Sequence, residues 1–149
     1  ICARLGIPTY HLHEKEQTRE QAKGGVGSQL SWYELLSHSQ RHLFHIARAL
    51  VANPEVLCID KPMQALDERS AERVLYLLRE FVDRRGIEQD DATWHTRSPR
   101  TCVMTATSRR GIELADQVFC VRGGDIQEVT RKEDVTTEML DQHRIIRSI

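Results

Sequence analysis

The sequence predicts an α/β fold in which a mostly parallel sheet is flanked by helices and followed by a C-terminal β-hairpin. Two short apolar runs, residues 56–59 and 101–106, have the pattern of strands buried on both faces of a parallel sheet. Amphipathic helical segments alternate with these runs, and Gly123-Gly124-Asp125 is a strong hairpin turn signal. Strands that alternate with helices indicate an α/β layer architecture.

Two long helices are expected, at residues 39–52 and 68–84. Apolar residues recur at helical spacing in both, which indicates one buried stripe on each helix. The stripe of the first helix is Leu43, Ile46, Ala47 and Leu50, and that of the second is Val74, Leu75, Leu78, Phe81 and Val82. Asn53-Pro54 ends the first helix, because proline cannot continue the helical hydrogen-bond ladder.

The other segments are shorter or less regular. The sequence predicts helices within residues 1–12 (before a turn at Pro8), near 112–114 and at 136–147, and strands at 117–121 and 126–129. Residues 13–29 are expected to form a polar loop, and residues 85–99 an irregular insertion.

Composition narrows the class of protein. The 149 residues include 21 basic and 22 acidic ones, a balance that gives no reason to expect nucleic acid as a partner. No apolar run approaches the roughly 18 to 20 residues that span a bilayer, so any membrane-crossing part is expected outside this sequence. The chain starts at Ile1, with no leader pattern, and reads as a piece of a longer protein. Its four cysteines are widely spaced and form no C-x-x-C pair, which favours a reducing, cytosolic compartment.

Three short sequence blocks contain the candidate functional residues, and their order along the chain is informative. The first is Leu36-Ser37-His38-Ser39-Gln40 at the start of a helix, and the second is the strand that ends at Asp60, followed by Lys61-Pro62 and Ala65-Leu66-Asp67. The third is the strand that leads to Thr107, with Ala115-Asp116 and Gly124 beyond it. Together they resemble the ATP-binding-cassette (ABC) family, from about residue 30 to residue 129.

The resemblance implies a partial domain of the P-loop NTPase type. Residues 1–149 would then be part of an ABC nucleotide-binding domain. They would divide into a helical-subdomain part with the signature helix (1–52), a core sheet with the Walker B and switch regions (53–132) and a C-terminal helix (133–149). The G-x-x-x-x-G-K-[ST] motif of the P-loop half is not found in the chain. The glycines at positions 24, 25 and 27 precede the signature helix and are interpreted as a surface loop.

The resemblance places the start of the signature helix against a phosphate. A helix N-terminus exposes unpaired N–H groups and a partial positive charge, which suit an anion. In the family, a Leu-Ser-Gly-Gly-Gln loop presents such a terminus to the γ-phosphate of ATP held by the partner cassette. Ser37 and Gln40 match this loop, whereas His38 and Ser39 replace its two glycines, and the His38 side chain can crowd the approach. An ordinary helix cap is the alternative interpretation of these four residues.

The second and third blocks predict a damaged catalytic centre. The resemblance makes Asp60 the Walker B aspartate, which holds Mg²⁺ through water; a cap of the next turn is the alternative. Lys61 stands where the family has the catalytic glutamate, and a protonated lysine has no acceptor for the proton of an attacking water. Thr107 replaces the switch histidine, and Asp67 ends the loop through which cassettes communicate across their dimer. We therefore expect slow hydrolysis or none.

ATP and Mg²⁺ are expected to bind only when a P-loop half completes the site. The signature helix at Ser37 and the strand end at Asp60 must then face the same end of the sheet. A second possibility is that His38, His42 and His45, which share a helix, bind zinc, but no carboxylate or cysteine joins them.

The function that the resemblance implies is coupling of ATP binding and hydrolysis to transmembrane transport. The implied partners are a second ABC nucleotide-binding domain, in a head-to-tail dimer, and transmembrane domains on another part or chain. The implied location is the cytosolic face of a membrane. A non-transport ABC ATPase of the translation or DNA-maintenance type, and a non-catalytic regulatory cassette module, are the alternatives.

Overall fold

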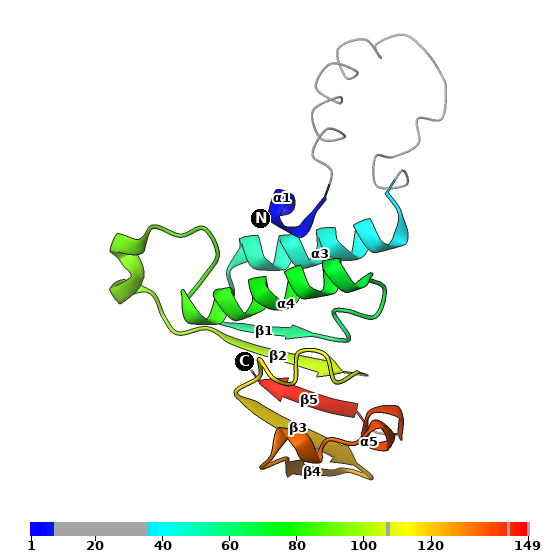
Figure 1. Ribbon diagram of the computed structural model, residues 1–149. Helices are drawn as coiled ribbons and strands as arrows, with labels where there is room; N and C mark the ends of the chain where they lie inside the picture. The colour runs from blue at the N-terminus through cyan, green and yellow to red at the C-terminus, as the bar shows by residue number, and fades with distance from the viewer. Residues whose placement is uncertain (8–35, 107, 143, 149) are drawn as a thin grey trace.

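The computed structural model describes residues 1–7, 36–106, 108–142 and 144–148 (Figure 1). The expected turn at Pro8, the expected loop at residues 13–29 and the switch position Thr107 lie outside these described residues. The described elements form an α/β structure with one five-stranded sheet, in the order β1-β2-β5-β3-β4. The α/β class expected from the sequence is therefore confirmed.

Both long helices form where the apolar spacing predicts them. Helix α3 spans His38–Ala52 and ends at Asn53, which takes a left-handed conformation at φ 48°. Helix α4 spans Glu68–Asp83 after an N-cap at Asp67. A short α1, Cys2–Leu5, precedes them, and two 3₁₀ turns, η1 at Asp91–Thr96 and η2 at Lys132–Asp134, lie in the connections. The expected insertion at residues 85–99 thus contains one short 3₁₀ element.

The sheet begins with a parallel pair. Strand β1, Val56–Ile59, pairs in parallel with β2, Thr101–Ala106. Strand β3, Gln117–Arg122, forms an antiparallel hairpin with β4, Asp125–Glu128, through the turn at Gly123 and Gly124, as predicted. Both glycines have positive φ, 58° and 96°, which explains their place in this turn.

The end of the chain differs from the prediction. In place of a helix over residues 136–147, a short α5, Thr137–Gln142, is followed by strand β5, Arg144–Ser148. Strand β5 lies between β2 and β3 and runs antiparallel to both. The sheet is consequently mixed, with one parallel and three antiparallel pairings among the described strands, and the expectation of mostly parallel pairing was wrong. The β-branched pair Ile145-Ile146 favours an extended chain, and two neighbouring strands provide its hydrogen bonds.

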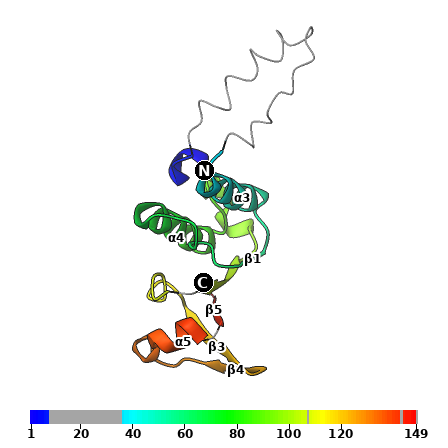
Figure 2. The same ribbon diagram turned by 90° about the vertical axis from the view of Figure 1, so that its right-hand side faces the viewer.

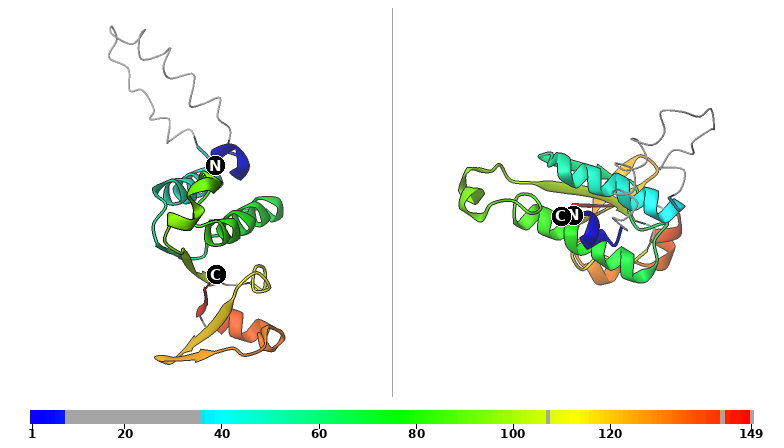
Figure 3. Two further views of the ribbon diagram at one scale, coloured as in Figure 1. Left: turned by 90° about the vertical axis from the view of Figure 1, so that its left-hand side faces the viewer. Right: turned by 90° about the horizontal axis from the view of Figure 1, so that it is seen from above.

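The core lies between the helices and one face of the sheet. Helices α3 and α4 lie side by side next to the β1 end, and α4 and α5 share one side of the sheet (Figures 2 and 3). The core cluster of buried residues includes Leu43, Ile46, Leu50, Leu57, Val74, Leu78, Phe81, Cys102, Met104 and Val118. None of the described helices is both long and apolar enough to cross a membrane.

Two local predictions need correction. Strand β1 was expected to be buried on both faces, but Val56 is 60% exposed and Cys58 is also exposed, because the described helices cover only the face that carries Leu57. The expected helix near residues 112–114 is a series of turns with hydrogen bonds to the third preceding residue. Gly111, at φ 79°, takes a left-handed conformation that interrupts helical geometry there.

Candidate functional site

The start of α3 and the segment after β1 meet at one end of the sheet. His38 and His42 from α3 line a cavity of about 470 Å³ together with Asp60, Lys61, Gln64 and Ala65. Helix α3 leads through a short connection into β1, so its first turn and the end of that strand lie at the same end. The structure therefore brings together the start of helix α3 and the strand end at Asp60, as the resemblance to the family requires.

Asp60 is held by a neighbouring strand. Its exposed carboxylate accepts a hydrogen bond from the Thr105 hydroxyl at 2.5 Å. Among the described residues, no hydrogen bond links this carboxylate to the turn that follows, so the structure does not support the alternative of a turn cap. Residues 59 and 104 pair in the register of β1 and β2, which places Thr105 beside Asp60 one position further on.

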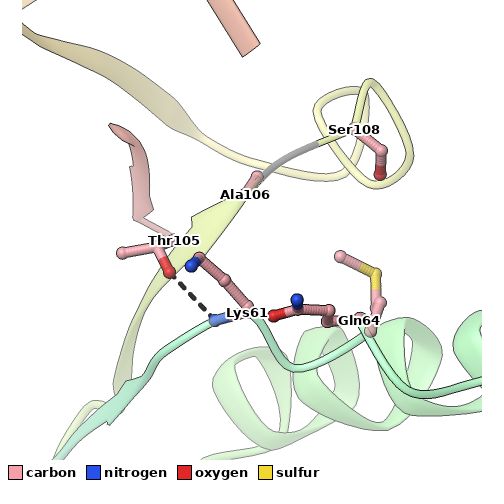
Figure 4. Close-up of a pocket in the computed structure, with 6 residues that line it drawn as sticks. Lys61, Gln64, Thr105, Ala106 and Ser108 are labelled. Carbon is pink, nitrogen blue, oxygen red and sulfur yellow. Dashed lines mark hydrogen bonds between the residues drawn. The ribbon is translucent and has the colours of Figure 1, made fainter. Parts of the chain in front are cut away.

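Lys61 adopts a strained backbone conformation beside the carboxylate. Its φ is 45°, in a region that a residue with a Cβ rarely adopts, and such conformations cost on the order of 1–3 kcal/mol. Its N–H donates to Thr105 Oγ1 at 2.9 Å (Figure 4). Thr105 thus binds both Asp60 and the backbone of Lys61, a role that sequence reasoning missed. The available signal was a polar residue near the end of a buried strand, next to the strand that leads to Asp60.

The Lys61 side chain faces two hollows. Besides the cavity shared with α3, it lines a second one of about 220 Å³ with Gln64, Thr105 and Ser108 (Figure 4). A lysine ammonium has three donors and no acceptor. At the position after Asp60 the site therefore offers a cation and hydrogen-bond donors, and no carboxylate.

Ser37 and Gln40 form a reciprocal cap at the start of α3. Ser37 Oγ accepts from the Gln40 N–H at 3.2 Å, and Gln40 Oε1 accepts from the Ser37 N–H at 2.9 Å. This is a capping box, the arrangement that the sequence offered as an alternative to a phosphate contact. The cap satisfies two of the free N–H groups of the terminus and holds the first turn of α3 in shape. A nucleotide contact by these residues stays a prediction.

Histidines on α3 do not form a metal centre. His42 Nε2 lies 2.7 Å from the carbonyl oxygen of Pro62, so this ring nitrogen is engaged by a backbone carbonyl. Within the described part of the chain, no group of three or more His, Cys, Asp or Glu residues could hold a metal ion. Asp60 would therefore need further ligands from elsewhere to bind Mg²⁺.

Asp67 caps the next helix. Its carboxylate accepts from the Ser70 N–H at 3.0 Å and from the Ser70 hydroxyl at 2.8 Å. These bonds stabilise the charged form, and the backbone bond from Ser70, followed by its side-chain bond, lowers the pKa of Asp67 below its ordinary value. The side chain is exposed at the end of the loop that the resemblance assigns to a dimer interface.

The start of helix α3 and the aspartate after strand β1 lie beside one cavity of an α/β structure, an arrangement compatible with part of a nucleotide-binding domain. Curated relatives identify the family. The sulfate/thiosulfate import ATP-binding protein CysA 1 of Agrobacterium fabrum is 36% identical over 100 residues, which are 67% of this chain and 25% of that protein. The spermidine/putrescine import ATP-binding protein PotA of Aster yellows witches'-broom phytoplasma is 26% identical, over 85% of this chain and 30% of that protein.

A third relative shows the same relation. The sulfate/thiosulfate import ATP-binding protein CysA of Mycobacterium tuberculosis is 28% identical over 86% of this chain and 33% of that protein. No family model and no solved structure matches the chain. The chain belongs to the ATP-binding-cassette family and is part of one of its nucleotide-binding domains. It spans about a quarter to a third of the length of these relatives.

Proposed function

We propose that this chain is the signature and Walker B part of an ABC nucleotide-binding domain with a P-loop NTPase fold, in which ATP binding drives transmembrane transport with weak hydrolysis or none. The names of the relatives, all import ATP-binding proteins, support the coupling to transport. Their names include both an anionic and a cationic cargo, so they favour neither kind of cargo for this chain. The complete site requires a P-loop half, which these 149 residues do not contain.

In the proposed site, the first turn of α3 faces the ATP of a second cassette in a head-to-tail dimer. Ser37 and Gln40 keep the helix terminus intact, and its remaining N–H groups attract the γ-phosphate. Asp60 would hold Mg²⁺ through water: its carboxylate is exposed, lies at the end of a strand and belongs to the cavity shared with α3. Magnesium usually takes one or two carboxylates along with substrate phosphates, and a single aspartate fits that pattern. When bound, the ion neutralises phosphate charge.

The proposal of weak turnover rests on the presence of Lys61 directly after Asp60. It occupies the position after Asp60 and lines both hollows of the site, where it can attract phosphate but cannot accept the proton of water. Loss of a general base typically slows a reaction about 10²- to 10⁴-fold. Thr107 lacks the imidazole of the family's switch histidine and adds to this loss. Binding without efficient turnover is therefore the proposed state.

The test is to restore the two missing groups. In the full-length protein with its transport partners, Lys61→Glu with Thr107→His should raise steady-state ATPase activity at least tenfold, because a carboxylate acceptor and an imidazole return. Lys61→Gln is the matched control: it removes the charge without adding a carboxylate and should restore little. Brisk turnover at this site in the unmodified protein would contradict the proposal.

The proposed partners follow from the same site. If helix α3 of this chain faces the ATP that another subunit holds, a second cassette is required. Asp67 would lie at the interface between the two cassettes. Transmembrane domains on another part or another chain would receive the resulting motion. The domain would work at the cytosolic face of a membrane.

A regulatory cassette module that binds a partner without turnover is the second candidate. It is favoured by His38 and Ser39, whose side chains occupy positions at the helix terminus that glycines keep open in the family. Calorimetric titration of ATP into the full-length protein distinguishes the two. Binding supports the transport cassette, and its absence supports the regulatory module.

A further inference from the structure

Two side-chain hydrogen bonds attach the first turns of α3 to the loop after β1. Ser39 Oγ donates to the carbonyl oxygen of Ala65 at 2.7 Å, and His42 Nε2 lies 2.7 Å from the carbonyl oxygen of Pro62. A carbonyl oxygen only accepts, so His42 carries a proton on Nε2 and is the donor. Ser39 and His42 are three residues apart and share one face of the helix. The helix therefore contacts the loop at two points.

The surroundings favour a defined geometry at both points. Ser39 and His42 are half-buried, and Pro62 is among the fully buried side chains. Partial burial limits competition from water, which makes a hydrogen bond more selective for one arrangement. The acceptors lie three residues apart, in a loop whose turns are also closed by the Gln64 N–H to the Lys61 carbonyl at 3.1 Å. The loop is consequently a compact unit rather than an extended connection.

The same loop is anchored on its other side by β2. Thr105 binds the carboxylate of Asp60 and the N–H of Lys61. A continuous series of contacts thus runs from β2 through Asp60 and Lys61 to the loop, and from the loop through Ser39 and His42 to α3. Movement of the helix terminus relative to Asp60 would require at least one of these bonds to break.

We propose that Ser39 and His42 are positioning residues that couple the two nucleotide-facing parts of this chain, so that the first turn of α3 and Asp60 move as one unit. The proposal rests on the proposed function, in which α3 faces one ATP of a head-to-tail dimer and Asp60 faces the other. A change at one nucleotide then shifts the part that faces the second. The Ser39 link depends on a hydroxyl that a glycine in the signature loop does not have, so this departure from the family pattern adds a contact.

The first experiment tests the link without nucleotide. Amide hydrogen exchange of residues 61–66 is measured in the full-length protein with Ser39→Ala, His42→Ala and both, and with the conservative Ser39→Thr and His42→Gln, which keep a donor. Loss of two hydrogen bonds should speed exchange of the loop on the order of tenfold in the double alanine variant. The conservative variants should stay near the unmodified protein. Arg48→Ala, an exposed change further along α3, is the matched control.

The second experiment tests coupling between sites. Equilibrium ATP binding to the full-length protein with its partner cassette should be cooperative, and the double alanine variant should lower the Hill coefficient towards 1, whereas Ser39→Thr and His42→Gln should retain it. Unchanged loop exchange in the double variant, conservative variants that behave like alanine, or a Hill coefficient that the double variant leaves unchanged would each overturn the inference. Absence of ATP binding in the unmodified protein would instead refute the proposed function, and the exchange data would still decide whether the link exists.

Discussion

Thr105 is the residue whose replacement tests the geometry of the site most directly. Thr105→Val keeps the branched shape of the side chain and removes its hydroxyl. That hydroxyl donates to the Asp60 carboxylate and accepts from the Lys61 N–H, so the substitution removes two hydrogen bonds at once. The change leaves a half-buried backbone donor and a carboxylate without these partners.

The expected loss follows from the exposure of each partner. A hydrogen bond between neutral groups contributes about 0.5–1.5 kcal/mol, and one to a charged group about 1.5–3 kcal/mol. Asp60 is exposed, so water replaces much of its lost bond, and its contribution falls towards about 0.5–1 kcal/mol. The two bonds together predict a decrease of about 1–2.5 kcal/mol in the free energy of unfolding. A slight gain from the strand preference of valine acts in the opposite direction.

Urea unfolding followed by circular dichroism measures this loss. Thr101→Val is the matched control, because Thr101 lies on the same strand and face and its hydroxyl forms no side-chain hydrogen bond with another described residue. Thr105→Val should lower the unfolding free energy by about 1–2.5 kcal/mol relative to Thr101→Val, with an unchanged m-value. Equal stability of the two variants would refute the assignment of Thr105 as the bridge between Asp60 and Lys61.

Two further predictions concern titrating groups. Because the folded state lowers the pKa of Asp67, its cap stabilises the protein fully above the unfolded carboxyl pKa of about 4 and is lost as pH falls through the folded value. In acid titrations of stability, the unmodified chain should therefore lose more than Asp67→Asn, which caps the helix without titrating; parallel curves would contradict this. Burial, with a smaller effect of Cys58, raises the pKa of Cys102 to about 12, so about one thiol in 10⁴ is ionised at pH 8. Alkylation at pH 8 with peptide mapping should modify the exposed Cys58 and spare Cys102 until the protein unfolds; fast labelling of Cys102 would show that the thiol is not buried.

Local patterns predicted much of the fold. The apolar stripes at residues 43–50 and 74–82 indicated α3 and α4 because a helix that packs on a core must repeat its buried face every three to four residues. The glycines at 123 and 124 predicted the hairpin because they accept positive φ. Each of these signals acts within a few residues, which is why it can be read without knowledge of the rest of the chain.

The candidate site was predicted in part. Ser37, Asp60 and Lys61 were identified from their motifs, and the structure places the start of α3, Asp60 and Lys61 around one cavity. The role of Thr105 and the donor functions of Ser39 and His42 were not predicted. Their partners lie 20 to 45 residues away in sequence, and the hydrogen bonds exist only once β2 and α3 are both packed beside the loop.

The sequence by itself determined the α/β class, the two long helices, the hairpin and the residue types of the site, including the missing carboxylate at position 61. Only the tertiary structure decided the sheet order and the conformation of the C-terminal segment. The β-branched pair Ile145-Ile146 favours an extended chain, but this local preference is too weak to decide by itself between helix and strand. Hydrogen bonds from β2 on one side and β3 on the other make this segment a strand. Strand pairing is a property of distant segments brought together, and short-range sequence patterns cannot specify it.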